Sequence, residues 1–174
     1  EDTFLAGPVG KVLQDQVTEL NKNMQGTLQA SSKNVALDTA GWYRVAEYQA
    51  NSLSILKGSF CNSVNISIKR AFVNADNEYY NMLLMSIYNK SRFVLIGKLV
   101  NKQCIDKIRH TIDASDLKAY IEIHYSFNAN NNIRINLYDT KDVSTFKWNA
   151  ITAVATEETV DGVSVVSSMD LTTA

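Results

Sequence analysis

The stretch LQDQVTELNKNMQG, residues 13–26, decides the fold of this chain, because a helical pattern ends within it. Its apolar residues recur at the spacing of a coiled coil, at Leu13, Val17, Leu20 and Met24. Gly26 can end the helix, and the sequence beyond it follows strand patterns. The stretch therefore predicts a short oligomerising helix that leads into a β-rich domain.

The helix is expected over residues 9–26, and Pro8 can open it because the first helical turn needs no N–H at that position. Two heptads are too few for an independent coiled coil, so a helix packed on its own domain is the alternative. Valine at a and leucine at d favour two strands. The e and g positions are neutral and give no charge code for the partner helix.

The remainder divides into an N-terminal tail at 1–8, a polar linker at 27–34 and a head domain at 35–174. The head contains nine or ten short runs with strand character, one of which alternates cleanly over residues 63–70. Residues 78–89 are ambiguous between helix and strand. This spacing predicts a mainly β fold, either a β-sandwich or a jelly roll.

The amino-acid composition indicates which classes of binding partner are expected. The formal net charge is −1, so no basic excess indicates nucleic acid or an anionic membrane as a partner. No apolar run reaches the length of a membrane span, so no membrane insertion is expected. Asn, Ser and Thr are abundant, which suits neutral polar ligands such as glycans, or else populates turns and strand exteriors. The chain starts with Glu1, and we expect a soluble fragment of a longer protein with its natural C-terminus.

Cofactor chemistry has little support in the sequence. Cys61 and Cys104 could pair, but neither has metal-ligand spacing, and we favour buried thiols. His110 and His124 could converge with Cys104, yet a zinc site needs further ligands. We therefore predict no metal and no cofactor.

Catalytic chemistry is likewise weakly indicated. Glycoside hydrolysis needs two carboxylates across a cleft, and no pair stands out among the candidates Asp106, Asp113, Asp116, Glu122 and Asp139. The sequence lacks nucleophile-elbow, zincin, P-loop and EF-hand motifs. We predict a protein that is not an enzyme, with glycan hydrolysis as an alternative.

Aromatic and asparagine-rich segments are the better indication of a binding site. Trp42 and Tyr43 lie on one predicted strand and are expected in the core, whereas Tyr79 follows a polar turn and is expected to be exposed. Recognition residues commonly lie on loops of a rigid scaffold. The predicted receptor-binding residues are Asp76, Asn77, Tyr79, Asn130 and Asn131.

The segment DTAGWYRVAE, residues 38–47, resembles the strand that opens the head domains of bacteriophage or prophage tail fibres and receptor-binding proteins, with their GWYR-(I/V)-A segment. The resemblance continues through residues 105–109 and 119–125 and an Asn-rich turn before Ile133. It covers roughly residues 35–150.

This resemblance implies a homotrimeric virion component, in a tail fibre or baseplate, that acts outside the cell. Its coiled stalk would end in a head that binds a bacterial surface glycan or protein, and it would contact other virion tail proteins. A purely structural trimerisation or attachment domain is the alternative. The family provides no catalytic residues to transfer. Two features depart from it: the heptads favour a dimer, and a glycine-rich stalk is missing.

Overall fold

The computed structural model describes residues 7–56, 62–70, 77–87, 90–140 and 148–174, with the backbone alone for residues 21–30, 62, 139 and 140. A helix, α1 (Pro8–Thr27), is followed by ten strands and one short helix, α2 (Leu53–Leu56). The fold is mainly β, as the sequence predicted.

The strands form two antiparallel five-stranded sheets. Sheet A has the order β1-β8-β3-β4-β5, with bounds Leu28–Leu37, Asn131–Thr140, Asn62–Arg70, Glu78–Ile87 and Lys90–Val100. Sheet B has the order β10-β6-β7-β2-β9, with bounds Val163–Asp170, Ile105–Asp113, Lys118–Tyr125, Gly41–Gln49 and Asn149–Thr156.

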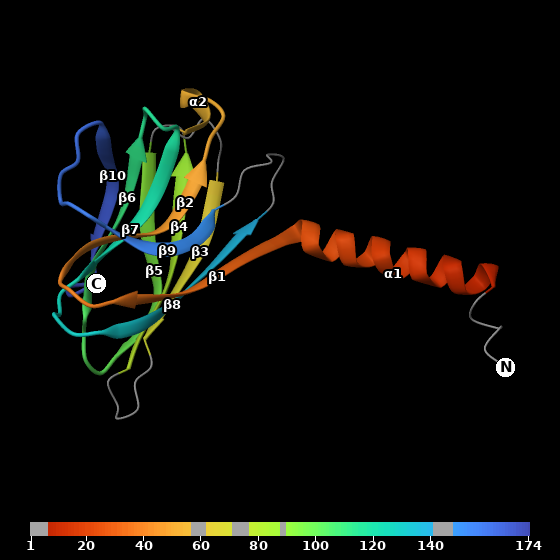
Figure 1. Cartoon of the computed structure of the whole chain (residues 1–174), viewed down its shortest axis with the longest axis horizontal. Helices are drawn as coiled ribbons and strands as arrows, with labels where there is room; N and C mark the ends of the chain where they lie inside the picture. Colours follow the sequence, from red (N-terminus) through yellow and green to blue (C-terminus); the bar gives the residue numbers. More distant parts are fainter. Residues whose placement is uncertain (1–6, 57–61, 71–76, 88–89, 141–147) are drawn as a thin grey trace.

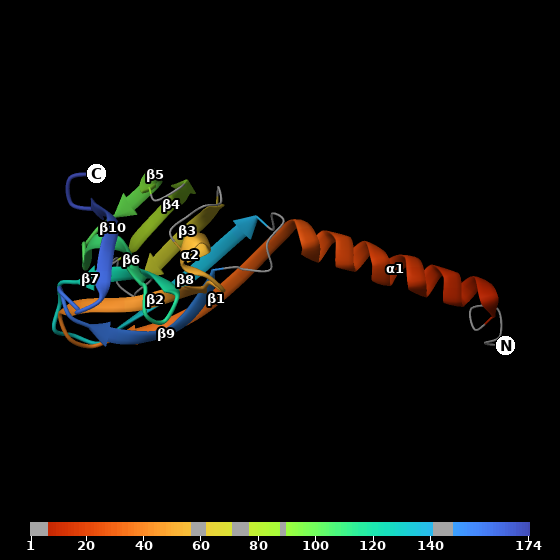
Figure 2. The same ribbon diagram turned by 90° about the horizontal axis from the view of Figure 1, so that it is seen from above.

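Alternation along the strands creates the core. On β3, Val64, Ile66 and Ile68 are fully buried, because each faces sheet B while the residues between them face outwards. Ile121 and Ile123 of β7 join the same hydrophobic cluster from the other sheet. Two sheets that share one core are compatible with the predicted β-sandwich (Figures 1 and 2). The jelly-roll connectivity stays a prediction.

The structure corrects the predicted secondary structure of one segment and decides that of another. The prediction of a polar linker at 27–34 is wrong, because β1 begins at Leu28. This strand pairs with β8 along its whole length, from Leu28 opposite Thr140 to Leu37 opposite Asn131. As an edge strand, β1 can carry polar side chains towards solvent, and that polarity masked its strand character. Residues 78–87 of the ambiguous segment form β4, in which Tyr80 and Met82 alternate with outward-facing neighbours.

Helix α1 projects from the head and has its main contacts with β1 (Figures 1 and 2). Its apolar residues Leu13, Val17 and Leu20 are each about half exposed, at 49%, 52% and 59%. The alternative of a helix packed on its own head is therefore wrong. The side chain of Met24 lies outside the described residues. Assembly into a coiled coil stays a prediction.

The end of the head that points away from α1 is formed by loops. Strand β1 leads away from the helix, so its last residue, Leu37, lies at the far end together with the first residue of β4, Glu78. Loops 38–40, 101–104 and 126–130 and residue Asn77 gather there. We call these segments the distal loops.

Candidate functional site

Hydrogen bonds tie the distal loops to one another. The backbone N–H of Asn101 donates to the carbonyl of Asn77 at 2.9 Å, and that of Ser126 donates to the carbonyl of Cys104 at 2.8 Å. The N–H of Ala40 donates to Oδ1 of Asn128 at 2.9 Å. Because each bond joins two different connections, the distal loops form one surface.

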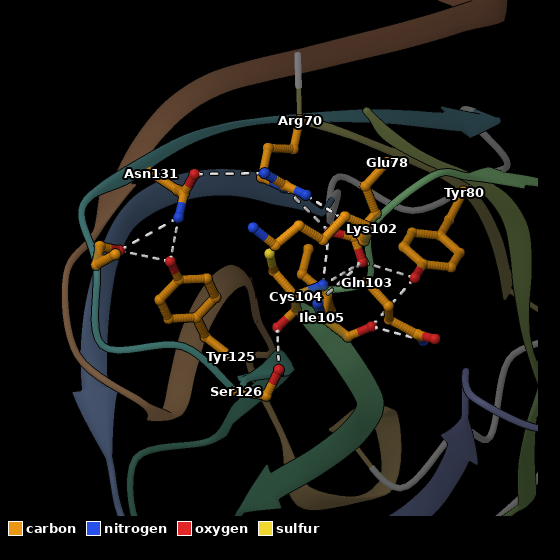
Figure 3. A network of polar contacts seen from close by, with 11 residues as sticks. Arg70, Glu78, Tyr80, Lys102, Gln103, Cys104, Ile105, Tyr125, Ser126 and Asn131 are labelled. Carbon is orange, nitrogen blue, oxygen red and sulfur yellow. Dashed lines mark hydrogen bonds and ion pairs between the residues drawn. The ribbon is translucent and has the colours of Figure 1, made fainter. Parts of the chain in front are cut away.

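A buried carboxylate supports this surface from below (Figure 3). Glu78 accepts hydrogen bonds from the hydroxyl of Tyr80 at 2.7 Å and from the backbone N–H groups of Cys104 and Ile105, the latter at 2.9 Å. Arg70 pairs with Glu78 at 3.2 Å, and both side chains are almost completely buried. The Arg70 guanidinium also donates to the carbonyl of Lys102 at 2.6 Å. Glu78 and Arg70 therefore fix the loop between β5 and β6.

The same network reaches the Asn-rich turn. Asn131 donates through its amide to the hydroxyl of Tyr125 and to the carbonyl of Ala129. The hydroxyl of Tyr125 in turn donates to the Ala129 carbonyl, so three groups close the turn between β7 and β8. Burial raises the pKa values of Tyr80 and Tyr125, and the neighbouring Glu78 raises that of Tyr80 further. Both hydroxyls therefore stay protonated and remain donors.

The predicted receptor-binding residues fall in different places. Asn77 and Asn130 are exposed in the distal loops, whereas Tyr79 is exposed on the outer face of sheet A. Asn131 is 7% exposed and its amide is engaged within the network. Asp76 lies outside the described residues. The distal loops thus retain Asn77 and Asn130 as accessible candidates.

The GWYR segment has a structural role that can be followed residue by residue. Gly41 has a φ of +152°, which side-chain-bearing residues rarely adopt. The guanidinium of Arg109 lies 3.9 Å from the centre of the Trp42 ring. Arg44 and Arg109 both pair with the buried carboxylate of Glu122, at 3.1 and 2.6 Å. The segment therefore anchors β2 to its neighbour β7, which carries Glu122, and across β7 to Arg109 of β6.

Each histidine has a side-chain partner in the structure. His110 contacts the hydroxyl of Ser91 through Nδ1 at 2.8 Å, and burial lowers its pKa to about 4. His124 pairs with Asp106 at 2.6 Å. No group of three or more His, Cys, Asp or Glu in the described residues could hold a metal ion.

The remaining sequence candidates are distributed over the fold. Cys104 is buried, whereas Cys61 lies outside the described residues. Trp42 and Tyr43 are buried and Tyr79 is exposed, as predicted. Within the described ranges, neither helix has the length and hydropathy that crossing a membrane requires.

Sequence reasoning missed two buried ion-pair clusters among the described residues, Arg70–Glu78 and the pairing of Glu122 with two arginines. The first had a usable signal, because Arg70 and Glu78 flank the polar turn before Tyr79 and carry opposite charges, and the structure pairs them directly across β3 and β4. The second had none, because an alternating strand places a charged residue equally well in solvent or under a neighbouring loop. The carbonyls of Glu157 and Glu158, which accept from Arg109, come from a connection distant in sequence.

Comparison with known proteins gives one structural match. No protein-family model matches the chain, and no curated protein matches it in sequence. The crystal structure of the Acinetobacter phage vB_ApiP_P1 tailspike protein is similar with a TM-score of 0.41 and 12% sequence identity. The match covers 73% of this chain and 23% of that one, so this chain spans about a quarter of the tailspike's length.

Proposed function

We propose that this chain is a phage or prophage tail-fibre head that binds a bacterial surface glycan or protein as a homotrimer. The observation that carries the proposal is the separation of two surfaces. An exposed apolar stripe lies on α1, at Leu13, Val17 and Leu20, and the polar distal loops lie at the other end of the molecule. The resemblance of the GWYR segment to tail-fibre heads supports the same assignment.

The stripe on α1 suits assembly. Large apolar residues repeated on one helical face favour burial against equivalent helices. Assembly would place several heads side by side, so that weak single sites act together on a cell surface. The head would be part of the virion, in a tail fibre or baseplate, outside the cell, and would contact other tail proteins.

The test is retention of the fluorescently labelled chain on a panel of bacterial strains after washing. We expect retention on some strains and none on others, because receptors differ between strains. Absence of retention on every strain would favour the structural trimerisation or attachment role. Release of shorter saccharides from the surface polysaccharide of a retaining strain would instead indicate a hydrolase.

A further inference from the structure

The outer face of sheet A carries an unusual pair of positive charges. Lys69 of β3 lies directly opposite Arg134 of β8, and both side chains are exposed. Like charges at facing positions of neighbouring strands destabilise a sheet. No carboxylate among the described residues pairs with either cation, and Arg134 instead donates to Oδ1 of Asn136 at 3.2 Å. The described outward positions of sheet A hold no Asp or Glu. An anionic group is therefore the natural complement of this pair.

Two exposed tyrosines flank the same surface. Tyr79 of β4 lies opposite Lys69 of β3, and Tyr138 of β8 lies opposite Asn65 of β3. Their exposed fractions are 39% and 40%. In a flat sheet, four residues along the strand and two strands across separate them by about 16 Å. That span suits an oligosaccharide rather than a single sugar.

Short polar side chains fill the area between the rings. Ser67 lies between Asn136 and Asn81 in the register, and Ser32 continues the row on β1. These amides and hydroxyls can both donate and accept hydrogen bonds. Sugar hydroxyls would contact the accessible polar groups of this row, on Ser67, Asn136 and Ser32.

We infer that the outer face of sheet A binds an acidic oligosaccharide. The carboxylate of an acidic sugar lies between Lys69 and Arg134, where charge-assisted hydrogen bonds are strong. Tyr79 and Tyr138 stack on neighbouring sugar rings, since an aromatic ring offers apolar area together with a polar edge. This inference rests on the proposed function and adds to it a ligand class and a site on the sheet face, separate from the distal loops.

The experiment measures binding of the full chain to alginate, hyaluronan and polysialic acid, each in its native form and with its carboxyl groups reduced to alcohols. We expect at least one native polymer to bind. Its reduced form should bind with an affinity lower by about tenfold or more. The double variant Lys69→Gln, Arg134→Gln should lose about tenfold or more in affinity. Tyr138→Ala should also weaken binding.

The matched control is Lys90→Gln with Arg92→Gln, which removes two exposed cations from β5 of the same sheet. Its affinity should stay within about twofold of the wild type. Equal loss in both double variants, equal binding of native and reduced polymers, or no binding to any of them would overturn the inference. If the Lys69, Arg134 double variant is retained on bacterial cells as well as the wild type, this inference falls while the proposed function stands. If no strain retains the wild type, the proposed function falls.

Discussion

Replacing Glu78 with glutamine tests whether the buried carboxylate holds the distal end together. The carboxylate accepts from Arg70 at 3.2 Å, from Tyr80 at 2.7 Å and from the Ile105 N–H at 2.9 Å. Glutamine keeps the size but removes the charge, and its NH₂ group faces donors instead of accepting from them. Arg70 is left buried without a counter-ion, which costs about 3–5 kcal/mol in free energy of unfolding.

The assay is urea unfolding followed by tryptophan fluorescence, at one fixed protein concentration because assembly adds to the apparent stability. The control Glu157→Gln removes an exposed carboxylate and should change the free energy of unfolding by no more than about 0.5 kcal/mol. Hydrogen exchange should accelerate in residues 101–104 and 126–131 of the Glu78→Gln variant, because the network fixes both segments.

The double variant Arg70→Met with Glu78→Gln separates the ion pair from the rest of the network. It leaves no unpaired buried charge, so it should be more stable than Glu78→Gln alone. A loss below about 1 kcal/mol in Glu78→Gln, or a double variant that is less stable than the single one, would refute the reasoning.

Three further predictions address other parts of the molecule. Light scattering on the wild type should give three times the 19.4 kDa mass of one chain, and Leu13→Asp with Val17→Asp should give a monomer, since charges on the stripe prevent its burial. Burial lowers the pKa of His110 from 6.5 to about 4, so the unfolded chain binds this proton first as the pH falls. Stability should therefore drop between pH 6.5 and 4 by up to about 3 kcal/mol more in the wild type than in His110→Gln, measured by urea unfolding at each pH. Gly41→Ala should lower the free energy of unfolding by about 1–3 kcal/mol and lower the melting temperature. The cause would be backbone strain at a φ of +152° and not a steric clash, since nothing lies within 4 Å of the added Cβ.

The fold was largely predictable because its strands have strong alternation. Ile66 and Ile68 alternate with polar neighbours on β3, and burial follows directly from that period. The helix was equally predictable from Pro8 and the apolar spacing. The strand nature of residues 28–34 was not, because an edge strand is held by backbone pairing with β8 that its own side chains do not reveal.

The candidate site was predictable in part. The sequence predicts that polar turn residues such as Asn77 and Asn130 lie in exposed loops, and the structure places them there. The same pattern predicts an exposed Asn131. In the structure Asn131 is the first residue of β8, and its side chain is buried. The facing of Lys69 and Arg134 depends on the register of strands that are far apart in sequence, and no local pattern contains that information.

One measurement tests the central claim, an oligomeric head that binds the bacterial surface, most directly. The amount of labelled protein retained on a susceptible strain is compared between the wild type and the Leu13→Asp, Val17→Asp variant at equal chain concentration. The account predicts strong retention of the wild type and retention weaker by about a hundredfold in the variant, because joined heads gain effective concentration. Equal retention of the two proteins, or none of the wild type on any strain, would contradict it.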